Sequence, residues 1–363
     1  MLDESAVGDL AALRESLARG RSLPSQWYTD PDVYAIELSK VLRRSWHYAA
    51  HTGELAVVGD QLPIEVAGVP IVLVRDSDLE VRGYVNVCRH RAHVVVLEPR
   101  NRKAMTCSYH GWSYSLDGSL KHAPRSEFEP DFDASECSMK PVQVAVWGPT
   151  IWVNPDLNAP SFDEWIAGLP QQVAENGIDV DRHGFAFGRD WQINANWKVF
   201  VDNAIECYHC PVAHPSLSRI IETDPTQQTL VVGATNWSSH RTPLRKSEAN
   251  PNGDRVYFFH WIWPTTYFQY AGAGFDVGSI RLVDVDHFVF RSQFFVADDL
   301  DPSELQARRQ RLDDDPTVPE DIAICERVQH AHASGAAEPG RLLVGSELLV
   351  QHFQQVLVDT ISQ

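Results

Sequence analysis

Several features that mark other classes of protein are missing from this sequence. No window approaches the ~18 uncharged apolar residues of a membrane-spanning helix, and the acidic N-terminal stretch lacks the apolar core of a secretory signal. Basic residues are the minority, 31 against 49 acidic ones, and the net charge of −18 disfavours nucleic acids and anionic membranes as partners. No G-x-G-x-x-G follows a predicted strand, so no dinucleotide site is expected. We therefore expect a cytoplasmic protein that binds neither nucleic acid nor membrane.

Cysteine is also too sparse for a disulfide scaffold. Six cysteines in 363 residues are expected to be buried thiols or metal ligands. The 44% hydrophobic and 22% charged content is ordinary for a globular protein. Because the length exceeds what one core usually holds, two domains are expected.

The sequence pattern changes twice along the chain. Residues 1–45 are expected to be mostly helical, and 46–157 contain short β segments separated by Pro and Gly. Residues 158–363 mix both patterns. Helices are predicted at 197–210, 303–312, 319–333 and 346–361, and strands at 255–270 and 279–296. The pattern predicts an α+β protein with an all-β domain inserted near its N-terminus.

Two short segments of the β region each combine a cysteine with a histidine. Cys88-x-His90 is followed, after sixteen residues, by Cys107-x-x-His110. A zinc finger usually separates its cysteines from its histidines, whereas a Rieske [2Fe–2S] cluster takes two Cys on one iron and two His on the other. A zinc ribbon or unconnected core residues are the alternatives.

A second set of candidate ligands lies in the α+β region. On a helix over 197–210, Asp202, Glu206 and His209 share a face, and Pro211 is expected to end the helix just before His214. A solvated helix face is the plainer interpretation. Two histidines and a carboxylate, however, form the facial triad of non-haem iron oxygenases. Cys207 and Cys210 lack the context of a redox motif and are not expected to do chemistry.

The third ligand of such a triad should be a carboxylate from elsewhere in the chain. On the helix predicted at 319–333, Asp321 points with the apolar face and Glu320 points away. A carboxylate on an apolar face needs a partner, and a metal is a good one. The alternative is an acid favoured only by the helix macrodipole.

An aromatic stripe follows the odd positions of 257–270. On a strand these side chains share one face, which is either plain core or part of a cage for a quaternary ammonium group. Trp261, Trp263 and Tyr267 are the candidate substrate-binding residues.

The motifs C-x-H-x16-C-x-x-H-G-W and D/E-x3-D/E-x2-H-x4-H resemble those of Rieske non-haem iron oxygenase α subunits, the aromatic-ring-hydroxylating family. The resemblance implies an N-terminal helical segment, 1–45, packed on a helix-grip catalytic domain, 158–363, with a Rieske domain at 46–157. It implies that Cys88, His90, Cys107 and His110 hold one [2Fe–2S] cluster.

The same resemblance implies that His209, His214 and Asp321 ligate one mononuclear Fe(II). Asp202 matches the first acid of the motif. Glu206 matches the acid that connects the iron site to a cluster histidine of the next subunit in a homotrimer. Many members carry Asp there, and Glu is associated with the branch that acts on quaternary ammonium compounds.

The implied function is that of a terminal oxygenase. A separate reductase or ferredoxin would supply electrons, and the iron would use dioxygen to hydroxylate or oxidatively demethylate a small substrate of the betaine, carnitine or choline type. Monooxygenation or dihydroxylation of an aromatic or natural-product substrate is the alternative. Outside the enzymes, a Rieske-type electron-transfer protein needs only the β region, and a binding protein would keep the fold without turnover.

Overall fold

The computed structural model describes residues 3–233, 236–247, 250–272 and 274–363. The chain forms two compact units. The smaller is Arg43–Phe162, and the larger combines Met1–Leu42 with Asp163–Gln363. The smaller unit is therefore inserted into the sequence of the larger one. Within the described residues, no helix is both long and apolar enough to cross a membrane.

The regular elements of the smaller unit are mainly strands, joined by loops and short 3-10 helices. Seven strands form one antiparallel sheet, in the order β1-β10-β9-β4-β3-β2-β5, and three short ones form a second, β6-β7-β8. The strands are β1 (His47–His51), β2 (Asp60–Val66), β3 (Val69–Arg75), β4 (Val81–Val85), β5 (Arg100–Asn101), β6 (Met105–Thr106), β7 (Ser113–Tyr114), β8 (Leu120–His122), β9 (Pro141–Trp147) and β10 (Thr150–Asn154). The alternating apolar segments and Gly- and Pro-rich turns account for this meander.

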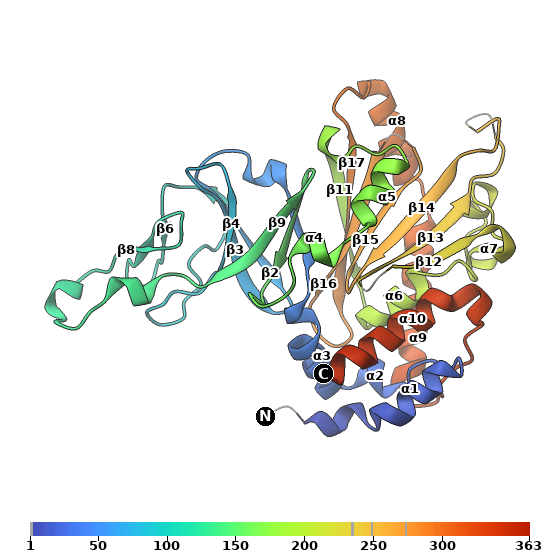
Figure 1. Ribbon diagram of the computed structural model, residues 1–363, viewed down its shortest axis with the longest axis horizontal. Helices are drawn as coiled ribbons and strands as arrows, with labels where there is room; N and C mark the ends of the chain where they lie inside the picture. The colour runs from blue at the N-terminus through green and yellow to red at the C-terminus, as the bar shows by residue number, and fades with distance from the viewer. Residues whose placement is uncertain (1–2, 234–235, 248–249, 273) are drawn as a thin grey trace. The chain divides into compact units, whose positions relative to one another are not determined.

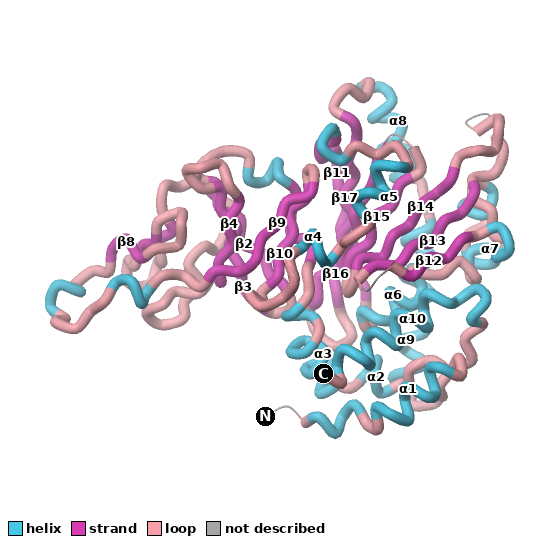
Figure 2. Tube along the Cα trace, viewed as in Figure 1, coloured by secondary structure: helices cyan, strands magenta, loops and turns pink. Residues whose placement is uncertain are grey.

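The larger unit is organised around one antiparallel sheet of seven strands, which Figure 2 shows as a continuous magenta layer. Their order is β11-β17-β16-β15-β14-β13-β12. The strands are β11 (His183–Ile193), β12 (Thr229–Val232), β13 (Trp237–Pro243), β14 (Val256–Ile262), β15 (Thr266–Tyr270), β16 (Gly274–Leu282) and β17 (Phe288–Ala297). Helices cover both faces of this sheet.

On one face Phe200 of α6 packs against Phe288 and Phe290 of β17. On the other face Ser239 contacts Gln172 of α5. The helices are α1 (Leu10–Ala18), α2 (Gln26–Thr29), α3 (Pro31–Lys40), α4 (Phe162–Trp165), α5 (Leu169–Glu175), α6 (Trp197–Ala204), α7 (Cys210–Ala213), α8 (Pro302–Asp313), α9 (Thr317–Ala333) and α10 (Val344–Ile361).

The N-terminal helices pack against the C-terminal ones, as Figure 1 shows for α1 and α2 beside α10 and α9. Gln351 of α10 donates a hydrogen bond to the Leu17 carbonyl at 2.6 Å. At the deepest contact, Lys198 of α6 pairs with Glu37 of α3 at 2.8 Å, and both side chains are fully buried. Segments from both ends of the chain therefore support the helix that leads into the candidate site.

The three helices α8, α9 and α10 lie close to their predicted positions. Each of the two segments predicted as a single strand, however, contains parts of two strands. The segment predicted as one strand at 255–270 is the hairpin β14–β15, because Trp263 and Pro264 lie in a turn. Likewise, the segment predicted as one strand at 279–296 contains the end of β16, a turn and most of β17. Pro264 in the first turn and Asp284 and Asp286 in the second were the signals for these breaks, because Pro is excluded from central strands and Asp favours turns.

Candidate functional site

The helix that leads into the site is shorter than predicted. Asn196 caps the start of α6 by accepting a hydrogen bond from the Lys198 backbone N–H at 3.0 Å. The helix ends at Ala204, so the prediction of one helix over 197–210 is wrong. The Glu206 carboxylate turns back and accepts hydrogen bonds from the backbone N–H groups of Tyr208 and His209. These bonds stabilise a turn in place of another helical turn.

The short helix α7 follows, and it places the two histidines. His209 directly precedes it and His214 directly follows it. Pro211 lies in its first turn, so the prediction that Pro211 ends the preceding helix is also wrong. Four helical residues between the histidines bring their Nε2 atoms to 3.1 Å from each other.

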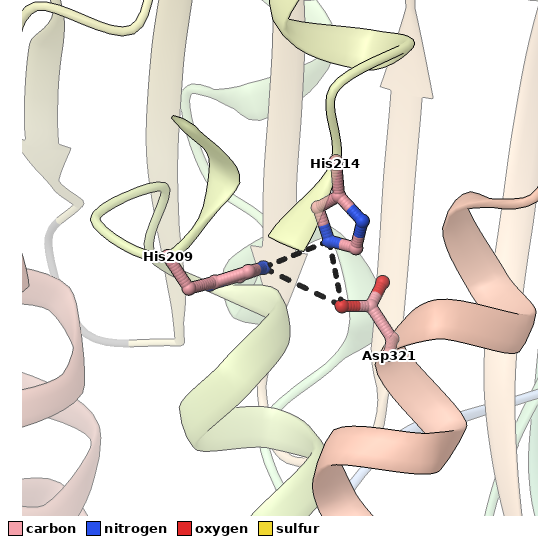
Figure 3. Close-up of side chains that lie close together, drawn as sticks. All are labelled: His209, His214 and Asp321. Atoms are coloured by element: carbon pink, nitrogen blue, oxygen red, sulfur yellow. Dashed lines mark hydrogen bonds and ion pairs between the residues drawn. The ribbon is translucent and has the colours of Figure 1, made fainter. Parts of the chain in front are cut away.

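Asp321 of α9 completes a triangle with these two nitrogen atoms (Figure 3). Its Oδ1 lies 2.9 Å from His214 Nε2 and 3.4 Å from His209 Nε2. Two ligands at adjacent corners around one metal, each about 2.1 Å from it, lie about 3.0 Å apart. The three side chains therefore fit a single metal ion bound on one face.

A second carboxylate holds each imidazole from behind. Glu206 contacts Nδ1 of His209, and Glu320 lies 2.7 Å from Nδ1 of His214. An N–H on each Nδ1 that donates to its carboxylate leaves both Nε2 lone pairs for a metal. The prediction that Glu320 points away from the site is wrong, because His214 reaches it from the loop after α7. The adjacent acids Glu320 and Asp321 were the only sequence signal for this contact.

The acids also control how strongly the imidazoles hold a proton. Burial by itself lowers the pKa of His209, but hydrogen bonds with Asp321 and Glu206 raise it to about 9. The pKa of His214 is raised in the same way by Asp321 and Glu320, against its burial. Burial raises the pKa of Asp321, but the two histidines outweigh it and lower that pKa. Protons and a metal cation compete for this strongly anionic site.

Asp202 lies apart from these groups. Its carboxylate is buried and accepts hydrogen bonds from Tyr28 Oη at 2.6 Å and Gln354 Nε2 at 2.9 Å. It does not share a face with Glu206 and His209, because α6 ends between them. Asn203, which the sequence did not single out, lies closer, with Nδ2 3.5 Å from His209 Nε2.

The cysteines of this segment are bonded to each other. Cys207 and Cys210 form a disulfide, with Cα atoms 5.0 Å apart. The expectation that cysteines would be thiols or metal ligands is therefore wrong for this pair. The disulfide bridges the loop that carries Glu206 and His209.

The predicted cluster ligands come together in the smaller unit. Cys88 lies in the loop after β4, and Cys107 directly follows β6. Both are buried, and burial, reinforced by the neighbouring Cys88, raises the pKa of the Cys107 thiol. The rings of His90 and His110 lie 4.6 Å apart and are exposed. Two adjacent thiols inside and two adjacent imidazoles outside fit a Rieske cluster.

The loops of this second site are fixed by tight turns. Gly111 adopts a positive φ of 74°, which disfavours a side chain, and its N–H donates to the Cys107 carbonyl at 3.1 Å. Trp112 stacks on His90 with ring centres 5.1 Å apart. Tyr114, which the sequence did not single out, places its hydroxyl 3.3 Å from Cys88 Sγ.

A cavity of about 890 Å³ in the larger unit lies beside the segments that carry His214 and Asp321. Its lining includes Ser216 and Leu217 after His214 and Pro316 just before α9. The candidate residues Trp261, Trp263 and Tyr267 are buried and are not among the lining residues. Trp263 packs on Phe353, and Tyr267 donates to Asp276.

Comparison with known families decides what these two sites belong to. The profile for the catalytic domain of ring-hydroxylating α subunits matches residues 174–363, and that for the Rieske [2Fe–2S] domain matches residues 45–133. The chain belongs to the ring-hydroxylating oxygenase α-subunit family. The predicted family, its fold class and its oxidoreductase chemistry are thereby confirmed. The family carries one Rieske [2Fe–2S] cluster and one mononuclear iron, as predicted.

Named relatives share much of this α subunit. The carnitine monooxygenase oxygenase subunit of Escherichia coli (strain K12) is 34% identical over 247 residues, which is 68% of this chain and 66% of that protein. This alignment thus spans just under two thirds of that relative's length. Chloroplastic choline monooxygenase of Arabidopsis thaliana is 26% identical over 97% of this chain and 87% of that protein.

Solved structures agree with this assignment of the α subunit. A quaternary ammonium Rieske monooxygenase in complex with an inhibitor has a TM-score of 0.85 at 27% identity, covering 96% of this chain and 98% of that one. Naphthalene 1,2-dioxygenase from Rhodococcus sp. has a TM-score of 0.81 at 18% identity over 99% of both chains, and shares the fold.

Proposed function

We propose that this chain is the terminal oxygenase of a Rieske system and that His209, His214 and Asp321 ligate its mononuclear iron. The triangle of 2.9, 3.1 and 3.4 Å between their ligand atoms carries the proposal. Cys88, His90, Cys107 and His110 would hold the cluster. Bound iron would supply the site that takes up dioxygen and oxidises the substrate.

The chain's own residues prepare this site in three ways. Glu206 and Glu320 orient the imidazoles and keep their Nε2 atoms available. Asp321 balances part of the charge of a metal cation. Aromatic and aliphatic side chains contribute apolar surface to the adjacent cavity, where a substrate could be held.

The proposed substrate is a quaternary ammonium compound, which would be hydroxylated or oxidatively demethylated. Two observations support this class. Relatives and a structural neighbour are named for carnitine, choline and quaternary ammonium compounds. In addition, Glu206 occupies the position of the connecting acid, where a Glu is associated with the branch of the family that acts on quaternary ammonium compounds.

The proposed electron route begins at a separate reductase or ferredoxin and crosses between subunits of a homotrimer. Glu206 contacts His209 directly, and His90 and His110 are exposed, so both ends of such a route are available. A related structure is described as revealing inter-subunit electron transfer. We propose that the chain has three functional parts, namely an N-terminal helical segment at 1–45, a Rieske domain at 46–157 and a catalytic domain at 158–363. A cytoplasmic location stays a prediction.

Iron analysis combined with oxygen uptake tests the function. The oxygenase should contain about three irons per chain, two in the cluster and one mononuclear. Substitution His214→Ala should remove the mononuclear iron and substrate-dependent oxygen uptake but leave the Rieske spectrum unchanged. Two irons per wild-type chain and no uptake with a suitable reductase would instead indicate an electron carrier.

A further inference from the structure

A buried carboxylate that the proposed catalytic steps do not use lines the cavity. Asp276 lies on β16 and is only 6% exposed. Among the described residues, no Lys or Arg forms an ion pair with it. A buried acid without a cationic partner is costly and needs an explanation.

The surroundings of Asp276 satisfy its oxygen atoms but not its charge. Tyr267 Oη and Ser292 Oγ donate hydrogen bonds to Oδ2 at 2.8 and 3.0 Å. Gln269 donates another, and its own amide oxygen accepts from Tyr257. Burial raises the pKa of Asp276 to about 7, against these hydrogen bonds. A cation in the cavity would favour the ionised form.

This arrangement suits one kind of cation better than others. A primary ammonium group needs acceptors for its N–H bonds, and here Tyr267 and Ser292 already occupy Oδ2 of the carboxylate. A quaternary ammonium group has no N–H, so it is attracted by charge alone and places its methyl groups on aromatic faces. Aromatic rings are present in the lining, since Tyr257 and Phe294 line the same cavity and Phe187 stacks on Phe294.

Asp276 and the candidate iron site both lie near Tyr257. Both Asp276 and Asp321 raise the pKa of Tyr257, after the larger effect of burial, so the Tyr257 hydroxyl lies within electrostatic reach of both acids. Tyr257 lines the cavity. It also packs against the small group of buried side chains that contains Cys207 and Cys210. A substrate anchored at Asp276 would therefore extend toward the iron ligands.

The other charges of the cavity are more exposed and of both signs. Arg308 lines it and pairs with Glu304 at 3.0 Å. Two more arginines and two more acids complete the set, namely Arg255, Arg311, Asp314 and Asp315. Solvent screens such charges. We propose that Asp276 is the anionic anchor that selects the cationic head of a quaternary ammonium substrate, an inference that rests on the proposed function.

Matched pairs of ligands test this anchor in the iron-loaded protein. Choline is compared with its neutral isostere 3,3-dimethylbutan-1-ol, and glycine betaine with 3,3-dimethylbutanoate, by calorimetric titration. In at least one pair, wild-type protein should bind the cation about 100-fold more tightly, or about 2.7 kcal/mol. Asp276→Asn should abolish the difference, Asp276→Glu should keep most of it, and Asp314→Asn, at an exposed acid of the cavity, should change it less than about twofold.

The outcomes separate the anchor from the proposed function. If wild-type protein prefers the cations and Asp276→Asn keeps that preference, the anchor is wrong and the quaternary ammonium substrate stands. If wild-type protein binds both members of each pair equally, both are wrong. The wild-type comparison needs no variant, so a lack of preference for the cations overturns the anchor even if Asp276→Asn does not fold.

Discussion

At the scale of single residues, each histidine of the candidate iron site contacts a carboxylate through Nδ1, but the two carboxylates are held differently. Glu320, at the start of α9, reaches only His214 among the described histidines. Glu206 is held by two backbone N–H groups as well as by His209. Only Glu206 has the additional proposed role of connecting the mononuclear iron site to the Rieske cluster of the next subunit.

Substituting each acid by its amide should separate these roles. Glu206→Gln keeps an oxygen that can accept from His209, so both metals should stay bound, yet coupled turnover should fall about 10- to 100-fold. Glu320→Gln likewise keeps an oxygen that can accept from His214, so it should keep its iron and, having no bridging role, should change coupled turnover less than about twofold. Metal content and product formed per oxygen consumed are the measurements. Unchanged coupled turnover in iron-loaded Glu206→Gln would remove the bridging role.

Asp202 should make stability depend on pH. Burial raises its pKa from 3.8 to about 7 in the folded protein, although Tyr28, Gln354 and Lys198 lower it. Between these values the folded state binds an additional proton. The free energy of unfolding should therefore fall as pH rises through this range, by at most about 1.4 kcal/mol per pH unit, and level off above it.

Urea denaturation at about pH 5 and about pH 8 measures this dependence. Asp202→Asn cannot bind the proton, so its stability should fall less than that of the wild type. The control Asp359→Asn, at a side chain that is 56% exposed, should keep the wild-type slope. Equal slopes for wild type and Asp202→Asn would contradict the raised pKa.

At the scale of elements, the sequence predicts best those features that depend on local spacing. The two Cys–His loops are short, so the order of their residues already restricts the chemistry. The end of α6 was missed because a side-chain carboxylate, not a helix-breaking residue, satisfies the next backbone N–H groups. The cavity was missed because alternation along β14 and β15 identifies two faces but not where loops from α7 and α8 leave space.

The loop between α6 and α7 should depend on its disulfide. Cys207 and Cys210 enclose only two residues, so their bond should stabilise the whole fold by less than the usual ~2–4 kcal/mol. Its local effect should be larger, because it restricts the turn that holds Glu206 and His209. The double variant Cys207→Ser/Cys210→Ser should fold and bind the mononuclear iron up to about tenfold more weakly.

Iron titration of the cluster-loaded protein, with unfolding followed in parallel, measures both effects. Cys137→Ser is the matched control, because Cys137 is a free, partly exposed cysteine of the smaller unit. It should leave iron affinity unchanged. A double variant with wild-type affinity would show that the hydrogen bonds of Glu206 alone fix the turn.

At the scale of the whole molecule, each unit contains one of the two candidate metal centres. Cys88 and Cys107 belong to the unit formed by Arg43–Phe162, and His214 and Asp321 belong to the other. The insertion lets a compact β unit carry a cluster without contributing a strand to the catalytic sheet, whose described strands all lie between β11 and β17. The proposed turnover therefore requires electrons to pass from one unit to the other, either within a chain or between chains.

Complementation between two inactive variants distinguishes these routes. Cys88→Ser should lose the cluster and Asp321→Ala the mononuclear iron, so neither chain can complete a route by itself. If electrons cross between subunits, every mixed trimer of co-expressed chains pairs an intact cluster with an intact iron site at one of its interfaces, or about one third of them. Doubly tagged assemblies should then recover a comparable share of wild-type turnover, whereas mixtures of Asp321→Ala with His214→Ala should recover none. Inactive mixed trimers that contain both metals would place the route within a single chain and remove Glu206 from it.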